Sequence, residues 1–205
     1  PWKIAVLVRT KNLLHSIIEE LKIASIPYRA VDIEPLGERQ EVLDLFALTR
    51  ALLHPADRTA WLAVLRAPWC GLSLAELHIL SGADNTDFSQ RSIESLIVER
   101  GDLLNEEGCQ RLARFWLVMR AAADKQPLLT TSQLVERTWR SLGGDTYLDA
   151  NEMANARRYL QLLAELETQA GTIDLSLLQH RIENLFAASS ANEDAVDLLT
   201  IHKAK

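Results

Sequence analysis

The pattern of hydrophobic and polar positions at the start of the chain predicts alternating strands and helices. Residues 4–8 form a continuous apolar run rich in β-branched side chains, which is typical of a strand buried on both faces. Residues 12–24 then carry leucines and isoleucines at helical spacing, with Thr10 or Asn12 available as a cap. Pro27 breaks this helix, and residues 28–33 have the pattern of a second strand. Strand, helix and strand in this order predict a βαβ unit with a parallel sheet.

From residue 38 onward the pattern is almost wholly helical. We expect helices at 38–53, 57–66, 73–80, 89–99, 106–123, 131–141, 150–169 and 174–187. Several starts carry capping residues, namely Asp57, Ser73 with Glu76, Thr130 with Gln133, Asp149 with Glu152, and Asp174. A polar linker at 188–194 follows, and residues 195–202 return to a strand pattern, AVDLLTIH.

Strands are therefore expected only near the two ends of the sequence. The predicted fold class is α/β but predominantly helical, with a partial parallel sheet built from the two chain ends and a long all-α insertion between them. The last strand should rejoin the sheet that begins at Ile4. A length of 205 residues with 48% hydrophobic and 24% charged side chains suits one large globular domain or two small ones.

The formal net charge of −6 excludes a protein that coats nucleic acid by charge alone, so any DNA contact must be a local site. Cys70 and Cys109 are far apart, no metal-ligand cluster is evident, and two reduced thiols are expected. The apolar run at 4–8 is too short for a signal peptide or a membrane span. We expect a cytoplasmic protein, and both ends give the impression of having been cut from a longer chain.

Two groups of polar residues directly follow predicted strands. Arg9 comes after the first strand, where ligands of open parallel sheets bind, and its guanidinium could reach phosphate oxygens. Thr200, His202, Lys203 and Lys205 crowd the end of the last strand, where they could grip a phosphodiester backbone. Judged by position alone, Arg9 can also be a surface arginine without a ligand, and the residues after the last strand can simply be solvated polar side chains.

Other polar and aromatic features have a structural explanation as well as a functional one. The run 38–41, ERQE, suits a helix start and is explained by a solvated first turn. Trp61, Trp69, Trp116 and Trp139 could stack on bases, but their apolar neighbours at helical spacing favour core packing. A GxxxxGK[ST] phosphate loop and a Walker-B run do not occur in the sequence, so it is not expected to hydrolyse ATP alone.

Taken together, four segments resemble superfamily 1 DNA helicases of the UvrD/RecB type. IAVLVRT resembles motif IV, and IPYRAVDIEPLGERQEVLDLFALTRALLHPAD resembles the segment that follows it in the family. LRAPWCGLSLAEL resembles the next turn, and VDLLTIHKAK resembles motif V without its usual Gly-Leu-Glu. The segments occur in the family's order, which makes the resemblance more specific than any single motif.

The resemblance implies a RecA-like (P-loop NTPase-type) lobe 2A at 1–102 and 194–205, with a compact 2B-like helical insertion at 103–193. It gives Arg9 the catalytic role of a sensor of the nucleotide γ-phosphate. Glu38, Arg39 and Glu41 match the family's ERQE segment, which implies a role in nucleotide binding or in coupling to DNA. Val8 stands where the family often has an aromatic residue that stacks on adenine. Thr200, His202 and Lys203 match the positions that contact single-stranded DNA.

The same resemblance implies ATP and Mg²⁺ as cofactors of the parent protein, with none bound by this chain alone. It implies single-stranded DNA, the 1A and 1B lobes and subunits of repair complexes as partners, and no membrane. A helicase-like scaffold without catalytic activity is the alternative, because the acidic composition and large helical insertion also suit an interaction module. A nuclease domain following the helicase in RecB-like proteins remains an open addition.

Overall fold

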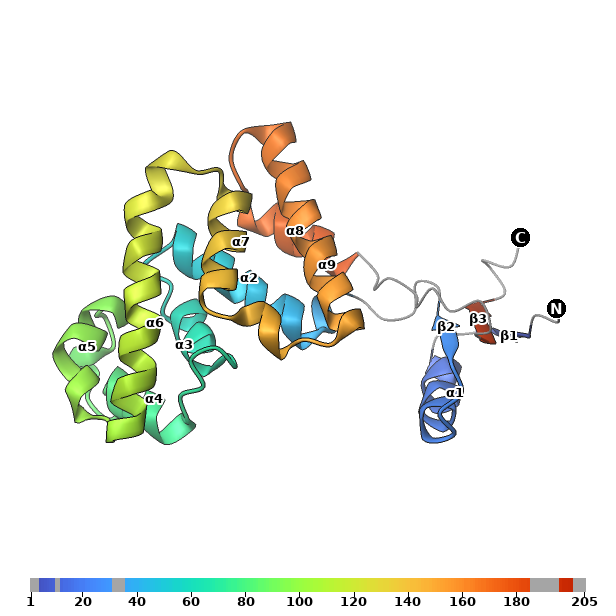
Figure 1. Cartoon of the computed structure of the whole chain (residues 1–205), viewed down its shortest axis with the longest axis horizontal. Coiled ribbons are helices and arrows are strands. Elements are labelled where there is room, and N and C mark those ends of the chain that lie inside the picture. The colour runs from blue at the N-terminus through green and yellow to red at the C-terminus, as the bar shows by residue number, and fades with distance from the viewer. Residues whose placement is uncertain (1–3, 10–11, 31–35, 185–195, 201–205) are drawn as a thin grey trace. The chain divides into compact units, whose positions relative to one another are not determined.

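The computed structural model describes residues 4–9, 12–30, 36–184 and 196–200. The chain divides into two compact units (Figure 1). The first, which we call the sheet unit, comprises Pro1–Arg39 together with Gln179–Lys205, and the second, the helical unit, comprises Gln40–Leu178. The sheet unit thus combines segments from the two chain ends.

Within its described ranges, the sheet unit contains three parallel strands in the order β1-β3-β2. These are β1 (Ala5–Val8), β2 (Tyr28–Ala30) and β3 (Val196–Thr200). The register pairs Val8 with Thr200 on one side of β3 and Tyr28 with Val196 on the other. The prediction that the last strand rejoins the sheet is confirmed. The structure adds that β3 is the middle strand, so it joins β1 to β2.

One face of the sheet packs against α1 (Asn12–Ile23). The core there consists of Val8, Leu14, Ile18 and Leu198. Because side chains alternate along a strand, the neighbours of Val8 point to the opposite face. Leu7 is 53% exposed there, so the predicted burial of the first strand on both faces is wrong for the described residues.

The helical unit is organised around α2 (Gln40–Leu53), which packs against α3, α7 and α8. The remaining helices are α3 (Arg58–Arg66), α4 (Leu74–Ser81), α5 (Ile93–Arg100), α6 (Glu106–Lys125), α7 (Thr131–Ser141), α8 (Ala150–Ala170) and α9 (Leu175–Glu183), the last of which runs into the sheet unit. Short 3-10 turns occupy Leu36–Glu38, Thr86–Phe88, Gly101–Leu103, Gln126–Leu128 and Gly144–Tyr147. All the predicted helices are present. The predicted linker at 188–194 lies outside the described residues.

Four of the predicted capping residues are confirmed by their hydrogen bonds. Asp57, Ser73, Thr130 and Asp149 all accept backbone N–H bonds as N-caps. The largest shift in a boundary is at α5, which begins at Ile93 because Ser92 caps it. Local capping chemistry therefore sets where most of these helices begin.

The four tryptophans for which the pattern predicts core packing all lie in the helical unit. Trp61, Trp69 and Trp139 are buried, and Trp116 is half-buried. Trp61 meets Phe115 edge to face at a centroid distance of 6.3 Å, and the indole N–H of Trp69 donates to the carbonyl of Val64. Buried indoles cannot stack on a base, so core packing explains the three buried residues.

The two compact units divide at 39/40 and 178/179. Residues 40–102 share the helical unit with 103–178, because α2 packs on α7 and α8. Our domain boundaries at 102/103 and 193/194 describe helicase lobes rather than compact units, and they stay a prediction.

Candidate functional site

The carboxyl edge of the sheet brings together two residues that are far apart in the sequence. Arg9 directly follows the last residue of β1, and Thr200 is the last residue of β3. Thr200 pairs in register with Val8, so Arg9 and Thr200 end neighbouring parallel strands at the same edge. Adjacent strands lie about 4.8 Å apart. Insertion of β3 between β1 and β2 thus makes these two positions neighbours.

Arg9 is exposed at this edge, while Val8 before it is buried against α1. Burial of Val8 holds the backbone in place, and the exposed Arg9 guanidinium is accessible to a ligand. The other residues predicted for this edge, His202, Lys203 and Lys205, lie outside the described residues, as does the side chain of Thr200.

Glu38 and Arg39 lie at the end of the sheet unit's first segment. Glu38 is exposed and ends the 3-10 turn Leu36–Glu38, and the Arg39 N–H donates to the Leu36 carbonyl at 3.2 Å. Residues 31–35, which connect this turn to β2, lie outside the described residues. The structure therefore places Arg9 and Thr200 at neighbouring strand ends, and the role of Glu38 and Arg39 beside a nucleotide stays a prediction.

Glu41 differs from the solvated first turn that we expected for the ERQE run. Its side chain is buried, and the Asn155 amide donates to its Oε1 at 2.8 Å. This bond ties the first turn of α2 to α8, which is 114 residues further along the chain. One turn on, Asp44 is also buried and accepts from Gln40. Burial raises the pKa of Asp44, and the neighbouring Glu41 charge raises it further.

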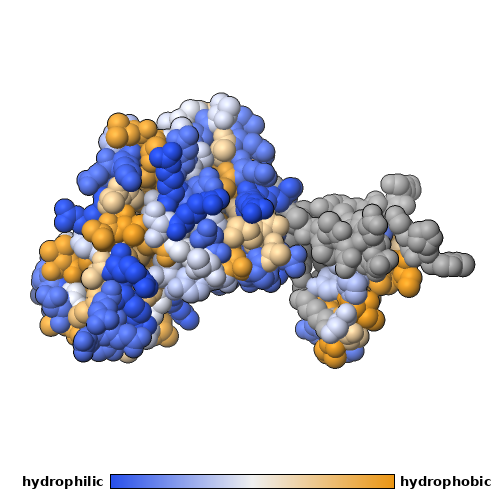
Figure 2. All heavy atoms as spheres, viewed as in Figure 1, coloured by the Kyte–Doolittle hydropathy of each residue, from blue (hydrophilic) through white to orange (hydrophobic). Residues whose placement is uncertain are grey.

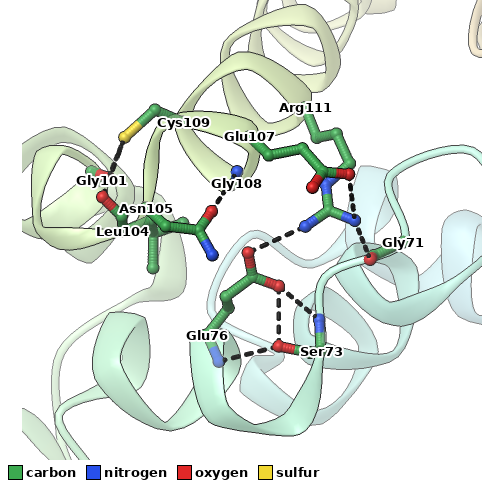
Figure 3. Close-up of polar contacts among 10 residues, drawn as sticks. All are labelled: Gly71, Ser73, Glu76, Gly101, Leu104, Asn105, Glu107, Gly108, Cys109 and Arg111. Carbon is green, nitrogen blue, oxygen red and sulfur yellow. Dashed lines mark hydrogen bonds and ion pairs between the residues drawn. The ribbon is translucent and has the colours of Figure 1, made fainter.

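A second polar cluster fastens α4 to α6 (Figure 3). Glu76 completes a capping box with Ser73, accepting from both its backbone N–H and its hydroxyl at 2.7 Å. The other carboxylate oxygen of Glu76 accepts from Arg111 Nη2 at 2.8 Å, and Arg111 Nη1 donates to the Gly71 carbonyl. The backbone bond from Ser73 is the main cause that lowers the pKa of Glu76, and Arg111 adds to it. The capping box is visible in the sequence, but the bond to Arg111 is not.

The backbone of α6 packs closely against this cluster at Gly108. Gly108 lies in the first turn of α6, where its N–H donates to the Asn105 side chain at 2.7 Å. A Cβ at Gly108 would come within 2.4 Å of Glu76 Oε1. Every oxygen of Glu76 is therefore committed to folding contacts, and this cluster has the chemistry of a structural joint rather than of a reactive site.

Comparison with known proteins identifies the family. The sequence model of the UvrD-like helicase C-terminal domain matches residues 2–185. The chain belongs to this family. The match includes β1, Arg9, Glu38 and Arg39, while Thr200, His202 and Lys203 lie beyond its end.

Individual relatives include the A subunits of ATP-dependent helicase/nucleases. The proteins of Lysinibacillus sphaericus and Bacillus pumilus are 24% and 26% identical over 98% of this chain, which covers 17% of each relative. The ATP-dependent DNA helicase UvrD1 of Mycobacterium tuberculosis is 36% identical over 40% of this chain and 11% of its own length. The UvrD-type sequence thus spans a small part of the curated relatives it matches.

The described residues of this UvrD-like domain give little support for a reactive thiol or a metal site. Burial raises the pKa of the Cys70 thiol to about 12, so it is a poor nucleophile. The described ranges contain no group of three His, Cys, Asp or Glu residues placed to hold a metal ion. In the same ranges no helix is long and apolar enough to cross a membrane.

Proposed function

We propose that this UvrD-like domain supplies the second, RecA-like motor lobe of an ATP-dependent DNA helicase. In this proposal β1, β2 and β3 belong to lobe 2A, and helices after residue 102 form a compact 2B-like insertion. The observation that carries the proposal is the position of β3 between β1 and β2, which brings Arg9 and Thr200 to neighbouring strand ends. Membership of the UvrD-like family supports it.

Arg9 is the residue to which we assign γ-phosphate sensing. A guanidinium is always charged and offers several donors in one plane, so it stabilises charge that develops on a phosphoryl group. An arginine in this role is worth about 10³–10⁵ in rate in other nucleotide hydrolases. Glu38 and Arg39 are assigned to the nucleotide side of the same lobe. The phosphate loop and the Mg²⁺ ligands are assigned to lobe 1A, which this sequence does not include.

Thr200, His202 and Lys203 are assigned to contact with single-stranded DNA. Hydroxyl, imidazole and ammonium groups donate to phosphate oxygens without reading sequence. Because Thr200 pairs with Val8, a shift of β3 on DNA binding would act directly on the strand that holds Arg9. This ladder is our proposed link between DNA binding and hydrolysis. One lobe supplies half of the DNA track, so the isolated chain should bind DNA weakly and in a salt-sensitive way.

The test uses the full-length protein with Arg9→Ala and a matched control, Arg158→Ala. Arg158 is an exposed arginine of α8. We expect Arg9→Ala to lower the DNA-stimulated ATPase rate by about 10³-fold or more while the affinity for single-stranded DNA stays within about threefold. Arg158→Ala should leave both unchanged. An Arg9→Ala protein that turns over ATP like the wild type would instead favour the non-catalytic scaffold.

A further inference from the structure

An open apolar groove runs between α6 and α7 within the helical unit. It has a volume of about 180 Å³ and is lined from α6 by Leu117, Val118 and Ala121, and from the other side by Leu129 and Leu134. Leu117 is 74% exposed. Figure 2 shows hydrophobic surface over α6 and over the turn that follows it. This exposed leucine lies beside a preformed hollow, and it would be buried if another apolar surface bound there.

The floor of the groove offers few hydrogen-bonding groups to a ligand. Thr138 and Ser141 are its two hydroxyl residues, and the Thr138 hydroxyl already donates to the Leu134 carbonyl at 2.7 Å. Most of the remaining lining is aliphatic, so an occupant gains affinity there by burying aliphatic side chains. A phosphodiester backbone would lose its hydration over the apolar part of such a floor.

The charged residues that line the groove are both cations. Lys125 and Arg137 are exposed, and neither forms an ion pair within the described part of the chain. In contrast, Arg140 on the next turn of α7 is paired with Glu136 at 2.9 Å. These two cations favour binding of a ligand that carries carboxylates. They stand out because the chain as a whole has a net charge of −6.

The dimensions suit a helix. Leu117 and Lys125 are eight residues apart on α6, which corresponds to a rise of about 12 Å, or slightly more than two turns. Ala121 and Ala122 are small, so a third helix axis can approach closely. Two turns of an amphipathic helix present an apolar stripe at positions i, i+3, i+4 and i+7.

We propose that this groove is a docking site for an acidic amphipathic helix of a partner protein. The aliphatic stripe of that helix packs on Leu117, Val118 and Leu134. Its flanking carboxylates pair with Lys125 and Arg137. This inference does not depend on the motor role proposed above, because it concerns only binding at the helical unit.

The test measures binding of fluorescein-labelled peptides to the 205-residue chain by anisotropy. The probe is a helical peptide of about four turns with leucine at i, i+3, i+4 and i+7 and glutamate on both flanks of that stripe. A second peptide carries lysine in place of every glutamate, and a DNA duplex of about 20 base pairs tests the competing ligand class. We expect the acidic peptide to bind at least about tenfold more tightly than either alternative.

Two matched variants on α6 locate the site. Ala121 lines the groove and Ala113 does not, and both are exposed. Ala121→Glu fills the groove and adds a repelling charge, so it should weaken the acidic peptide at least about tenfold, whereas Ala113→Glu should change its affinity less than about twofold. Circular dichroism checks that both variants are folded. The proposal is overturned by absence of acidic-peptide binding at millimolar concentration, by equal binding of the two peptides, by equal effects of the two variants, or by preferential binding of the duplex.

Discussion

Replacing Leu198 with alanine should unfold the sheet unit while leaving the helical unit intact. Leu198 lies in the central strand, is fully buried, and packs with Val8, Leu14 and Ile18. Leu→Ala removes apolar groups worth about 2.4 kcal/mol of transfer free energy and leaves a cavity, so the expected cost is about 3 kcal/mol. Among the described residues, this core is built on four buried hydrophobic side chains, so it cannot absorb much of that loss.

Hydrogen exchange read by mass spectrometry measures this effect segment by segment. A loss of about 3 kcal/mol speeds exchange from the open state roughly 150-fold, and we expect it in peptides that cover β1, β2 and β3. Peptides that cover α2 and α8 should keep wild-type protection. Leu74→Ala, at a leucine that is 67% exposed on α4, is the control and should change neither unit. Unchanged protection of β1 and β2 in Leu198→Ala would show that β3 does not hold this sheet together, and equal loss in α2 would show that the two units do not unfold separately.

Four further substitutions test residues of the helical unit by denaturant unfolding. The hydroxyls of Thr49 and Tyr159 lie 2.6 Å apart and buried, so Thr49→Val and Tyr159→Phe should each cost about 1–2 kcal/mol, and the double variant should cost at least 0.5 kcal/mol less than their sum, by order of magnitude. Asp44→Asn should stabilise the protein against unfolding at pH 7. The raised pKa of Asp44 means that the folded state binds the proton more tightly, so its ionised form costs stability as pH rises, and the gain should vanish below the ordinary value of 3.8. Gly144→Ala should destabilise the protein by about 1–3 kcal/mol, because a Cβ there would lie 2.0 Å from the Trp139 ring. For each of these substitutions, an unchanged free energy of unfolding would contradict the reasoning given for it.

The sequence predicts the elements well where local chemistry decides them. Ser73 with Glu76 and Asp149 with Glu152 form complete capping boxes, so α4 and α8 begin where the spacing indicates. The return of the last strand to the sheet also follows from its pattern. Its middle position does not, because the βαβ pattern is the same whether or not another strand enters between the first two.

The burial of polar residues on α2 could not be predicted from its own pattern. Val42, Leu45 and Leu48 mark one buried face, but Glu41 and Thr49 are buried as well, against α8. The covering helix comes more than a hundred residues later, and periodicity within α2 carries no sign of it. For the candidate site, the sequence singles out Arg9 and Thr200 separately, because each lies at the end of a predicted strand. Only the three-dimensional register shows that the two are neighbours.

The most direct test of the motor role is the single-turnover rate of ATP hydrolysis by the full-length protein at saturating ATP and single-stranded DNA. Saturation removes differences in binding, so the rate reports the step in which Arg9 is assigned to act. We predict that Arg9→Ala lowers this rate by about 10³-fold or more, and that Arg9→Lys, which keeps the charge but not the planar fork, recovers only a small part of it. A wild-type rate in Arg9→Ala would contradict the assignment.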